Sequence, residues 1–428
     1  MAELKRHLGL FHTTMYGVGL ILGAGIYALI GNATGTAGNS VWMSFVLAAI
    51  SAVFTGLSYA ELSSMYPKAA AEYSFVKNAF GNNFVAFLVG WLTLFVAVIS
   101  AAAISLGFAG YFTQIFQIPI ALAAVLIVVV LSFVNFFGIR ESSSMNIVFT
   151  VIEAAGLGIV IWAGLTFSGV HVDYLEMPNG FTGIFSAFTL VFFAYIGFEN
   201  IVNIAEEIKN PKKVLPRAII LAIAITAIIY ILVSVSAIRV LDWHALGSST
   251  APLADVIKKS LGEQWGFGIL IIALFATTNT ILIMLVSGSR ILYGISHDGA
   301  LPSLFSIIHQ KTKTPWIAAM LIGALSCAFV FSGNIGTVAN ISVFAIIMVF
   351  VLVNLSLIWL RYKEPNLERQ FRSPLNIGKF PVLAALGIIT PVLGIMELDS
   401  FVVLMGLGVL ASGALFHYIY NRIKPCPK

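Results

Sequence analysis

Two long apolar segments of this chain are each interrupted near the middle by glycines. The first interruption is GVGLILGAGI at residues 17–26, and the second is FFAYIGFE at residues 192–199. Lipid cannot satisfy the backbone N–H and C=O groups that an interrupted helix frees, so such a break survives in a membrane only where it lines a cavity or meets a polar ligand. Paired breaks in corresponding halves of a chain are typical of the substrate site of a membrane carrier.

The composition places these segments in a membrane. Of the 428 residues, 59% are hydrophobic and 10% are charged. Several apolar runs exceed the roughly 20 residues that cross a bilayer core of about 30 Å. We therefore expect an all-α polytopic membrane protein. The N-terminus is short and polar, and the helix after it is too long for a cleavable signal, so that helix stays in the mature protein. Cys327 and Cys426 provide no disulfide framework.

Hydropathy and the Gly, Asn and Pro residues between apolar runs predict twelve transmembrane helices. Their ranges are 12–37, 42–66, 83–113, 119–138, 145–168, 182–205, 216–240, 266–296, 315–333, 337–361, 379–397 and 400–421. Two connections are longer than the others, residues 169–181 and the amphipathic stretch 241–265.

The distribution of basic residues predicts the orientation. With the N-terminus inside, only Arg239, Lys258 and Lys259 lie outside, and the other 20 of the 23 Lys and Arg residues lie on the inner side. Positive charge favours the cytoplasmic side, so both termini are predicted to be cytoplasmic in a multi-pass protein of the cell membrane. The net charge of +5 reflects this orientation and does not indicate a nucleic-acid partner.

The interrupted helices divide the chain into two units of five helices. Residues 1–168 form the first predicted repeat and residues 182–361 the second, and each begins with an interrupted helix. Because five is odd, the second unit is inverted relative to the first, which is a known transporter architecture. Two additional helices follow at 379–421.

Several motifs in a fixed order carry a resemblance to one family. They are GAGIY at 23–27, YAEL at 59–62 with YP at 66–67, NFFGIR at 135–140, FAYIGFE at 193–199, AEEIKNP at 205–211, PRA at 216–218, SRILY at 289–293 and HDGALP at 297–302. From Leu8 to about Leu360 the chain resembles the amino acid–polyamine–organocation transporters. The resemblance implies the leucine-transporter-type inverted-repeat fold, with discontinuous helices one and six.

The first break predicts a carboxylate site. Gly23, Ala24 and Gly25 open into a second half-helix, whose N-terminus carries unpaired N–H donors and a partial positive charge. The alternative is that the glycines only allow close helix packing. That alternative does not explain the partner break at Gly197.

The second break predicts the opposite pole of the site. It comprises Phe193, Ala194, Ile196, Gly197 and Phe198. Freed carbonyls of Phe193, Ala194 and Ile196 are expected to face the ammonium group of the ligand. The resemblance implies that the carbonyl of Ile21 also contacts the amine and that Phe193 is an aromatic gate over the substrate. An ordinary core or lipid-facing aromatic remains the alternative for Phe193.

Two carboxylates, Glu153 and Glu199, lie inside predicted helices. A charged carboxylate in the membrane costs at least ~2–3 kcal/mol, so each is expected to be paired, hydrated or protonated. The resemblance implies proton-dependent gating by Glu199. Glu153 falls where some proton-coupled relatives have a lysine in place of a sodium ion. It could carry the coupling proton, bind sodium, meet a cationic substrate or serve as a structural hydrogen-bond anchor.

The substrate side chain is less clearly encoded. The third helix is small and apolar at 98–105, and Thr277, Thr278 and Asn279 could add polar contacts, which favours a neutral or broad range of amino acids. Charged residues near the inner helix ends could form a gating network or ordinary interfacial pairs. They are Glu61, Arg140, Glu141, Glu206, Glu207 and Arg290.

These observations favour a secondary active transporter of amino acids that works by alternating access and is coupled to H⁺. The alternatives are a sodium-coupled or exchange carrier of cationic amino acids or polyamines, and an amino acid sensor that does not transport. The seven histidines show no metal-ligand spacing within the membrane, and neither a catalytic arrangement nor a phosphate-binding loop is visible. We expect no enzyme activity, no cofactor and no metal site, and no ion channel, which would need a filter or a charged ring.

Overall fold

The computed structural model describes residues 8–67, 71–137, 143–168, 171–312 and 314–423. The protein is mostly helical, at 81%. By length and composition, nine helical segments among the described residues could cross a membrane. The first of them contains two helices, α1 (Leu10–Ala37) and α2 (Val41–Met65), which are joined by the short 3₁₀ helix η1 (Gly38–Ser40).

The other long helices follow in chain order. They are α4 (Asn83–Phe112), α5 (Ile120–Phe137), α6 (Ser143–Thr166), α7 (Gly180–Tyr195), η2 (Phe198–Glu207), α8 (Pro211–Val240), α11 (Glu263–His297), α13 (Ile335–Lys363) and α15 (Ser400–Ile423). Two apolar helices are shorter, α12 (Trp316–Val330) and α14 (Val382–Ile395). Each range expected from hydropathy overlaps one of these apolar helices.

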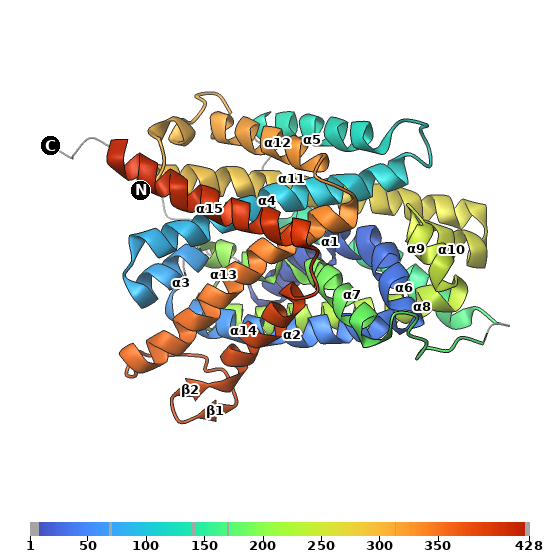
Figure 1. The fold of residues 1–428 in the computed structure, drawn as a ribbon, viewed down its shortest axis with the longest axis horizontal. Helices are drawn as coiled ribbons and strands as arrows, with labels where there is room; N and C mark the ends of the chain where they lie inside the picture. The colour runs from blue at the N-terminus through green and yellow to red at the C-terminus, as the bar shows by residue number, and fades with distance from the viewer. Residues whose placement is uncertain (1–7, 68–70, 138–142, 169–170, 313, 424–428) are drawn as a thin grey trace.

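The structure also contains short elements that the hydropathy pattern did not distinguish. They are α3 (Ala71–Phe80), α9 (Trp243–Ser248), α10 (Pro252–Leu261), η3 (Ser303–Ser306) and the antiparallel hairpin of β1 (Asn376–Ile377) and β2 (Phe380–Pro381). In Figure 1 the long helices run roughly from left to right, with α3 and the hairpin toward the left and α9 and α10 at the right. We name these two sides the α3 end and the α10 end.

The helices pack in two groups that meet at the centre of the molecule. In the first group, α1 and α2 pack against α7 and α8. In the second, α4 packs against α5, α11, α12 and α13. Small residues allow close approach between helices: a Cβ on Gly164 of α6 would lie 2.6 Å from the Cα of Ser236 on α8.

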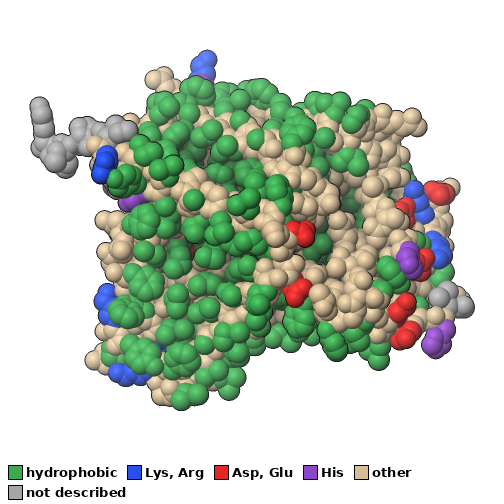
Figure 2. All heavy atoms as spheres, in the orientation of Figure 1, with side chains coloured by type: hydrophobic (Ala, Val, Ile, Leu, Met, Phe, Trp, Pro, Cys, Tyr) green, Lys and Arg blue, Asp and Glu red, His purple; other side chains and the backbone are tan. Residues whose placement is uncertain are grey.

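The outer surface along the helices is apolar. Large hydrophobic side chains such as Phe137, Phe331 and Met396 are more than 65% exposed. In Figure 2 hydrophobic side chains cover most of the visible face, and most of the visible charged side chains lie at the two ends. This pattern is the one expected of a polytopic membrane protein, because a lipid-facing surface has no water to solvate charges.

A candidate substrate site between two helix breaks

The structure confirms that both apolar segments are interrupted. In α1 the backbone leaves helical geometry at Gly23, with φ −7° and ψ −142°. Helix α7 ends at Tyr195, Ile196 is extended with ψ 131°, and Gly197 has φ 137° before η2 begins. That positive φ lies in a region that glycine adopts far more readily than other residues.

The two breaks touch each other through backbone atoms. A Cβ on Gly197 would lie 2.7 Å from the carbonyl oxygen of Leu20. A Cβ on Gly25 would lie 2.6 Å from the Cα of Ala194 and 2.8 Å from its Cβ. The glycines of each break therefore allow the other break to approach closely. As a result, the interruption of α1 and the end of α7 lie next to each other.

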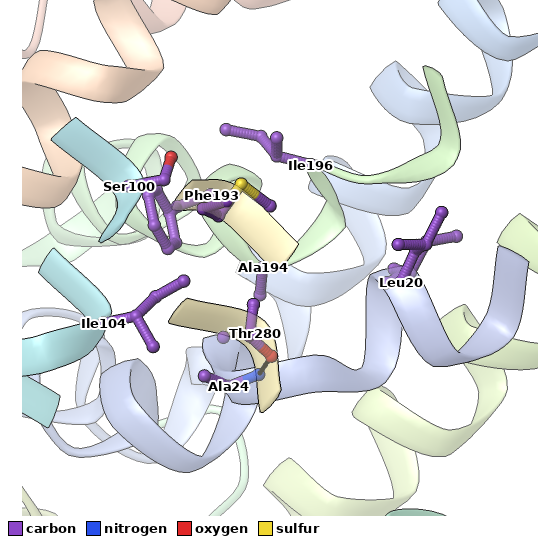
Figure 3. A pocket seen from close by; sticks show the side chains of 11 residues that line it. Leu20, Ala24, Ser100, Ile104, Phe193, Ala194, Ile196 and Thr280 are labelled. Atoms are coloured by element: carbon purple, nitrogen blue, oxygen red, sulfur yellow. Dashed lines mark hydrogen bonds between the residues drawn. The ribbon is translucent and has the colours of Figure 1, made fainter. Parts of the chain in front are cut away.

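A small cavity of about 20 Å³ lies between the breaks (Figure 3). Its lining is Leu20, Ile21, Ala24, Gly25, Ser100, Ile104, Phe193, Ala194, Ile196, Thr280 and Met284. This volume accommodates about one water molecule. We call it the central cavity, and it is too small for an amino acid in this conformation.

Six of the nine residues expected to bind substrate line the central cavity. They are Ile21, Ala24, Gly25, Phe193, Ala194 and Ile196. Gly23 and Gly197 belong to the breaks but are not part of its lining. Phe198 is fully buried in a different place, where its ring packs against Tyr59 and Phe350, with centroid distances of 5.6 and 5.3 Å.

Protein side chains contact three of the backbone groups that were expected to meet the ligand. The N–H of Ala24 donates to the Thr280 hydroxyl at 3.1 Å (Figure 3). The Tyr230 hydroxyl lies within hydrogen-bond distance of the carbonyls of both Ile21 and Ala194. It has a single hydrogen, so it can donate to only one of them at a time.

The carbonyl of Phe193 was expected to be free, but it accepts the N–H of Ile196 at 3.1 Å. Sequence reasoning did not identify Tyr230 or Thr280, because each contacts its break from a helix distant in sequence. The separations are 209 residues for Tyr230 and Ile21 and 256 residues for Thr280 and Ala24. No local pattern signals such contacts.

The wall of the central cavity is uncharged among the described residues. Ile104, Ile196 and Met284 contribute apolar surface. The hydroxyl of Ser100 is engaged with that of Ser342 at 2.8 Å. A ligand side chain in this cavity would therefore meet mainly apolar groups.

A larger cavity of about 480 Å³ adjoins the central cavity and shares Leu20 and Met284 with it. Its lining includes Glu72 of α3, Asn200 of η2 and Arg290 of α11, which places it toward the α3 end. We call it the vestibule. Its volume lies within the range of about 300–1,000 Å³ that is typical of small-molecule pockets.

Glu72 is a buried carboxyl on the wall of the vestibule. It is 5% exposed, and its Oε1 accepts the Tyr59 hydroxyl at 3.1 Å. Burial raises the pKa of the Glu72 carboxyl above its usual range, and hydrogen bonds from its own backbone N–H and from Tyr59 oppose this shift only in part.

At the α10 end, α1 packs closely against α9. A Cβ on Gly31 of α1 would lie 2.8 Å from the carbonyl oxygen of Leu246 on α9, and one on Gly35 would lie 3.1 Å from the Cα of Gly247. The backbone of α1 therefore packs directly against the backbone of α9. The central cavity adjoins the vestibule toward the α3 end, and α1 packs closely against α9 toward the α10 end.

Glu199 is buried at the second break and has partners on both carboxyl oxygens. Oε2 accepts the N–H of Gly197 at 2.8 Å, and Oε1 accepts the Asn200 amide at 3.0 Å. Its carboxylate lies in the first turn of η2, which is a favourable place for negative charge.

Glu153 of α6 is buried without a partner. It is 1% exposed, and neither carboxyl oxygen has a hydrogen-bond partner among the described residues. The amide of Asn279 on α11 lies beside it without meeting hydrogen-bond geometry. The Tyr27 hydroxyl of α1 donates to the backbone carbonyl of Glu153 at 2.9 Å, so this carboxyl lies next to the half of α1 that follows the break.

Glu61 forms a buried ion pair at the α3 end, but with residues that the sequence did not suggest. Its carboxylate lies 2.6 Å from Arg361 of α13 and 3.2 Å from Arg369. Arg290 is exposed on the vestibule. The remaining residues of the expected network lie outside the described residues or have side chains that the structure does not describe, namely Arg140, Glu141, Glu206 and Glu207.

Comparison with known proteins shows similarity over nearly the whole chain. Residues 8–418 match the family described as amino acid permease. The chain is 32% identical to the branched-chain amino acid permease of Bacillus subtilis (strain 168), over 98% of this chain and 94% of that protein. It is 30% identical to the methylthioribose transporter of the same organism, over the same shares. It is also 30% identical to the vacuolar cationic amino acid transporter 4 of Arabidopsis thaliana, over 85% of this chain and 64% of that protein.

Proposed function

This chain belongs to the amino acid permease family, whose members are transporters and not enzymes, and we propose that it moves amino acids across the cell membrane by secondary active transport. The main support is the pair of breaks that face each other across the central cavity. The vestibule on one side and the close backbone packing of α1 against α9 on the other side support alternating access, with this structure in the state that is open toward the α3 end.

The proposal includes the membrane layout expected from the sequence. Ten crossings form an inverted repeat of residues 1–168 and 182–361, and residues 379–421 add two helices, which makes twelve crossings. Both termini are cytoplasmic, because 20 of the 23 basic residues lie on that side. The α3 end is then the cytoplasmic end, and the vestibule is the inner vestibule.

The breaks would bind the two charged groups of the amino acid. The carboxylate would accept N–H groups of the segment 23–25, and the ammonium would donate to the carbonyls of Ile21, Ala194 and Ile196. Binding then requires the central cavity to expand and the hydroxyls of Thr280 and Tyr230 to give up their backbone partners. This mechanism uses backbone polarity at two helix ends and needs no charged side chain.

The apolar wall supports a substrate with an uncharged, apolar side chain. A cationic side chain against Ile104, Ile196 and Met284 would lose hydration without gaining a partner. Glu153 could neutralise such a cation, but it is not part of the central cavity lining. The similarity to a branched-chain amino acid permease supports the same substrate class.

Proton coupling through Glu153 and Glu199 completes the proposal. A buried carboxyl without a partner is far more stable protonated than charged, which makes Glu153 a suitable group to bind and release one proton in each cycle. Its position beside Tyr27 would link that proton to the movement of α1. Glu199, at the second break, would respond to the same movement.

Transport by purified protein in proteoliposomes tests the function. We expect uptake of labelled leucine when a pH gradient is imposed without sodium, and exchange of labelled for unlabelled leucine in counterflow. Binding without exchange would indicate a sensor. Uptake that requires sodium and ignores the pH gradient would refute proton coupling, and preferential uptake of arginine would refute the neutral substrate class.

A further inference from the structure

The β1–β2 hairpin is an exposed element whose role the transport mechanism does not explain. It turns at Gly378, which has φ 61°. In Figure 1 it projects sideways from the helical body near α14, and it does not extend as far to the left as the ends of α13 and α15. It therefore lies beside the helical body and not beyond its left end.

Two large apolar side chains of this hairpin region are exposed. Leu375 is 67% exposed and Ile377 is 75% exposed. Two amphipathic aromatic residues of the last turns of α13, Trp359 and Tyr362, are also more than half exposed. Trp and Tyr are typical of the boundary between lipid and water. In Figure 2 the corner that holds the hairpin shows hydrophobic side chains with Lys or Arg beside them.

Basic side chains accompany this apolar surface. Arg372 and Lys379, on either side of Leu375 and Ile377 in sequence, are exposed, and no ion pair among the described residues engages them. The exposed acidic residue of the same connection, Glu368, precedes them. The surface thus combines apolar groups with two available positive charges.

Polar contacts hold the hairpin in place. Arg361, which is paired with Glu61, donates to the side-chain carbonyl of Asn376 at 2.6 Å. The Asn376 amide donates to the carbonyl of Ser373 at 2.8 Å, and the N–H of Ser373 donates to Glu61 at 2.8 Å. These hydrogen bonds therefore fix the position of the loop that carries the exposed Leu375 and Ile377.

The backbone conformation of Leu375 also indicates that the surrounding structure holds the hairpin in place. Its φ of 55° is unfavourable for a residue with a side chain. Such a conformation persists only where the surrounding structure holds it, and it is found preferentially at functional sites.

We propose that the β1–β2 hairpin binds the anionic lipid surface of the leaflet at the α3 end. Leu375 and Ile377 enter the boundary of the acyl chains, and Arg372 and Lys379 contact headgroup phosphates. Apolar side chains flanked by basic residues are the combination that binds an anionic membrane surface. The proposal uses the membrane placement proposed above but does not depend on what the protein transports.

Fluorescence at position 377 tests insertion. In a background with Cys327→Ser and Cys426→Ser, Ile377→Cys is labelled with a polarity-sensitive dye, and Glu368→Cys serves as the control on the same connection. In phosphatidylcholine vesicles with 25% phosphatidylglycerol, we expect blue-shifted emission at 377 that spin-labelled lipids quench, and emission typical of water at 368. Emission typical of water at 377 would overturn the proposal. A blue shift without lipid quenching would also overturn it, because a second protein copy would then cover the hairpin.

Charge removal tests the preference for anionic lipid independently of the dye. Binding of phosphatidylglycerol is measured by the rise in melting temperature of the purified protein. Each basic residue near an anionic surface contributes about fivefold, so Arg372→Gln with Lys379→Gln should weaken this binding about thirtyfold. Lys258→Gln with Lys259→Gln, at the opposite end, should have a much smaller effect. Equal effects of the two pairs would refute a lipid site at the hairpin.

Discussion

Replacing Gly25 by alanine tests whether the contact between the two breaks forms the substrate site. The added Cβ would lie 2.6 Å from the Cα of Ala194 and 2.8 Å from its Cβ. Ordinary van der Waals contact begins at 3.4 Å, so the two breaks would have to separate by about 0.8 Å. The obstacle is backbone of α7, which cannot rotate away as a flexible side chain could.

The expected loss of affinity follows from this overlap. Inserting a methyl group into a close-packed site typically costs about 1–3 kcal/mol, which corresponds to about 5- to 150-fold weaker binding if the strain acts on the bound state. We expect Gly25→Ala to lose affinity for leucine by this factor in isothermal titration and to lose counterflow in parallel.

Two further variants distinguish a site effect from general destabilisation. Gly268→Ala on α11 is the matched control, because no described atom lies within 4 Å of its added Cβ, and it should bind leucine normally. Ala194→Gly combined with Gly25→Ala removes the 2.8 Å contact and should restore part of the affinity. If Gly25→Ala binds and exchanges leucine like the unmodified protein, the breaks do not form the site.

Four other substitutions test separate parts of the argument. Glu153→Gln should abolish accumulation driven by a pH gradient while counterflow continues, since an amide cannot carry the proton; full accumulation would rule out this role. Tyr230→Phe leaves a backbone carbonyl without its donor, so the melting temperature without ligand should fall, by the equivalent of about 1 kcal/mol, and leucine should stabilise the variant more than it stabilises the original protein. An unchanged ligand effect would contradict competition between the hydroxyl and the amine. Glu61→Gln leaves the Arg361 guanidinium buried without its countercharge and should lower stability by about 3–5 kcal/mol in thermal unfolding, whereas a loss below 1 kcal/mol would mean that water reaches the pair. Because burial raises the pKa of Glu72, ionising it destabilises the folded protein as the pH rises above about 4.5, so Glu72→Gln should raise the melting temperature at pH 7.5 and leave it nearly unchanged at pH 4.

The sequence allowed the helices and breaks to be predicted because both depend on local patterns. Apolar length predicts each long helix, and glycines at 23 and 197 predict where two of them are interrupted. The short helices α3, α9 and α10 were missed as separate elements. They lie at the ends of the bundle, and none is longer than 10 residues, so hydropathy does not distinguish them from polar connections.

The partners at the site could not be predicted in the same way. Tyr230 and Thr280 reach the breaks only after the chain has folded, and the Glu61–Arg361 pair joins residues 300 positions apart. The size of the central cavity depends on the conformation that the protein adopts, which no sequence motif specifies. Local chemistry therefore predicted the two helix breaks that border the central cavity, whereas the side chains that contact them could be identified only from the fold.

The position of the Tyr230 hydroxyl has a consequence for how fast such a protein can work. In the proposed site, an incoming amine would displace this hydroxyl from the carbonyl that it bonds, so at that carbonyl only the difference between two similar interactions would appear as affinity. When the amine departs, the hydroxyl is ready to return. On the proposed mechanism, one carbonyl would thus keep a hydrogen-bond donor both before capture and after departure, which favours shallow energy wells and rapid turnover.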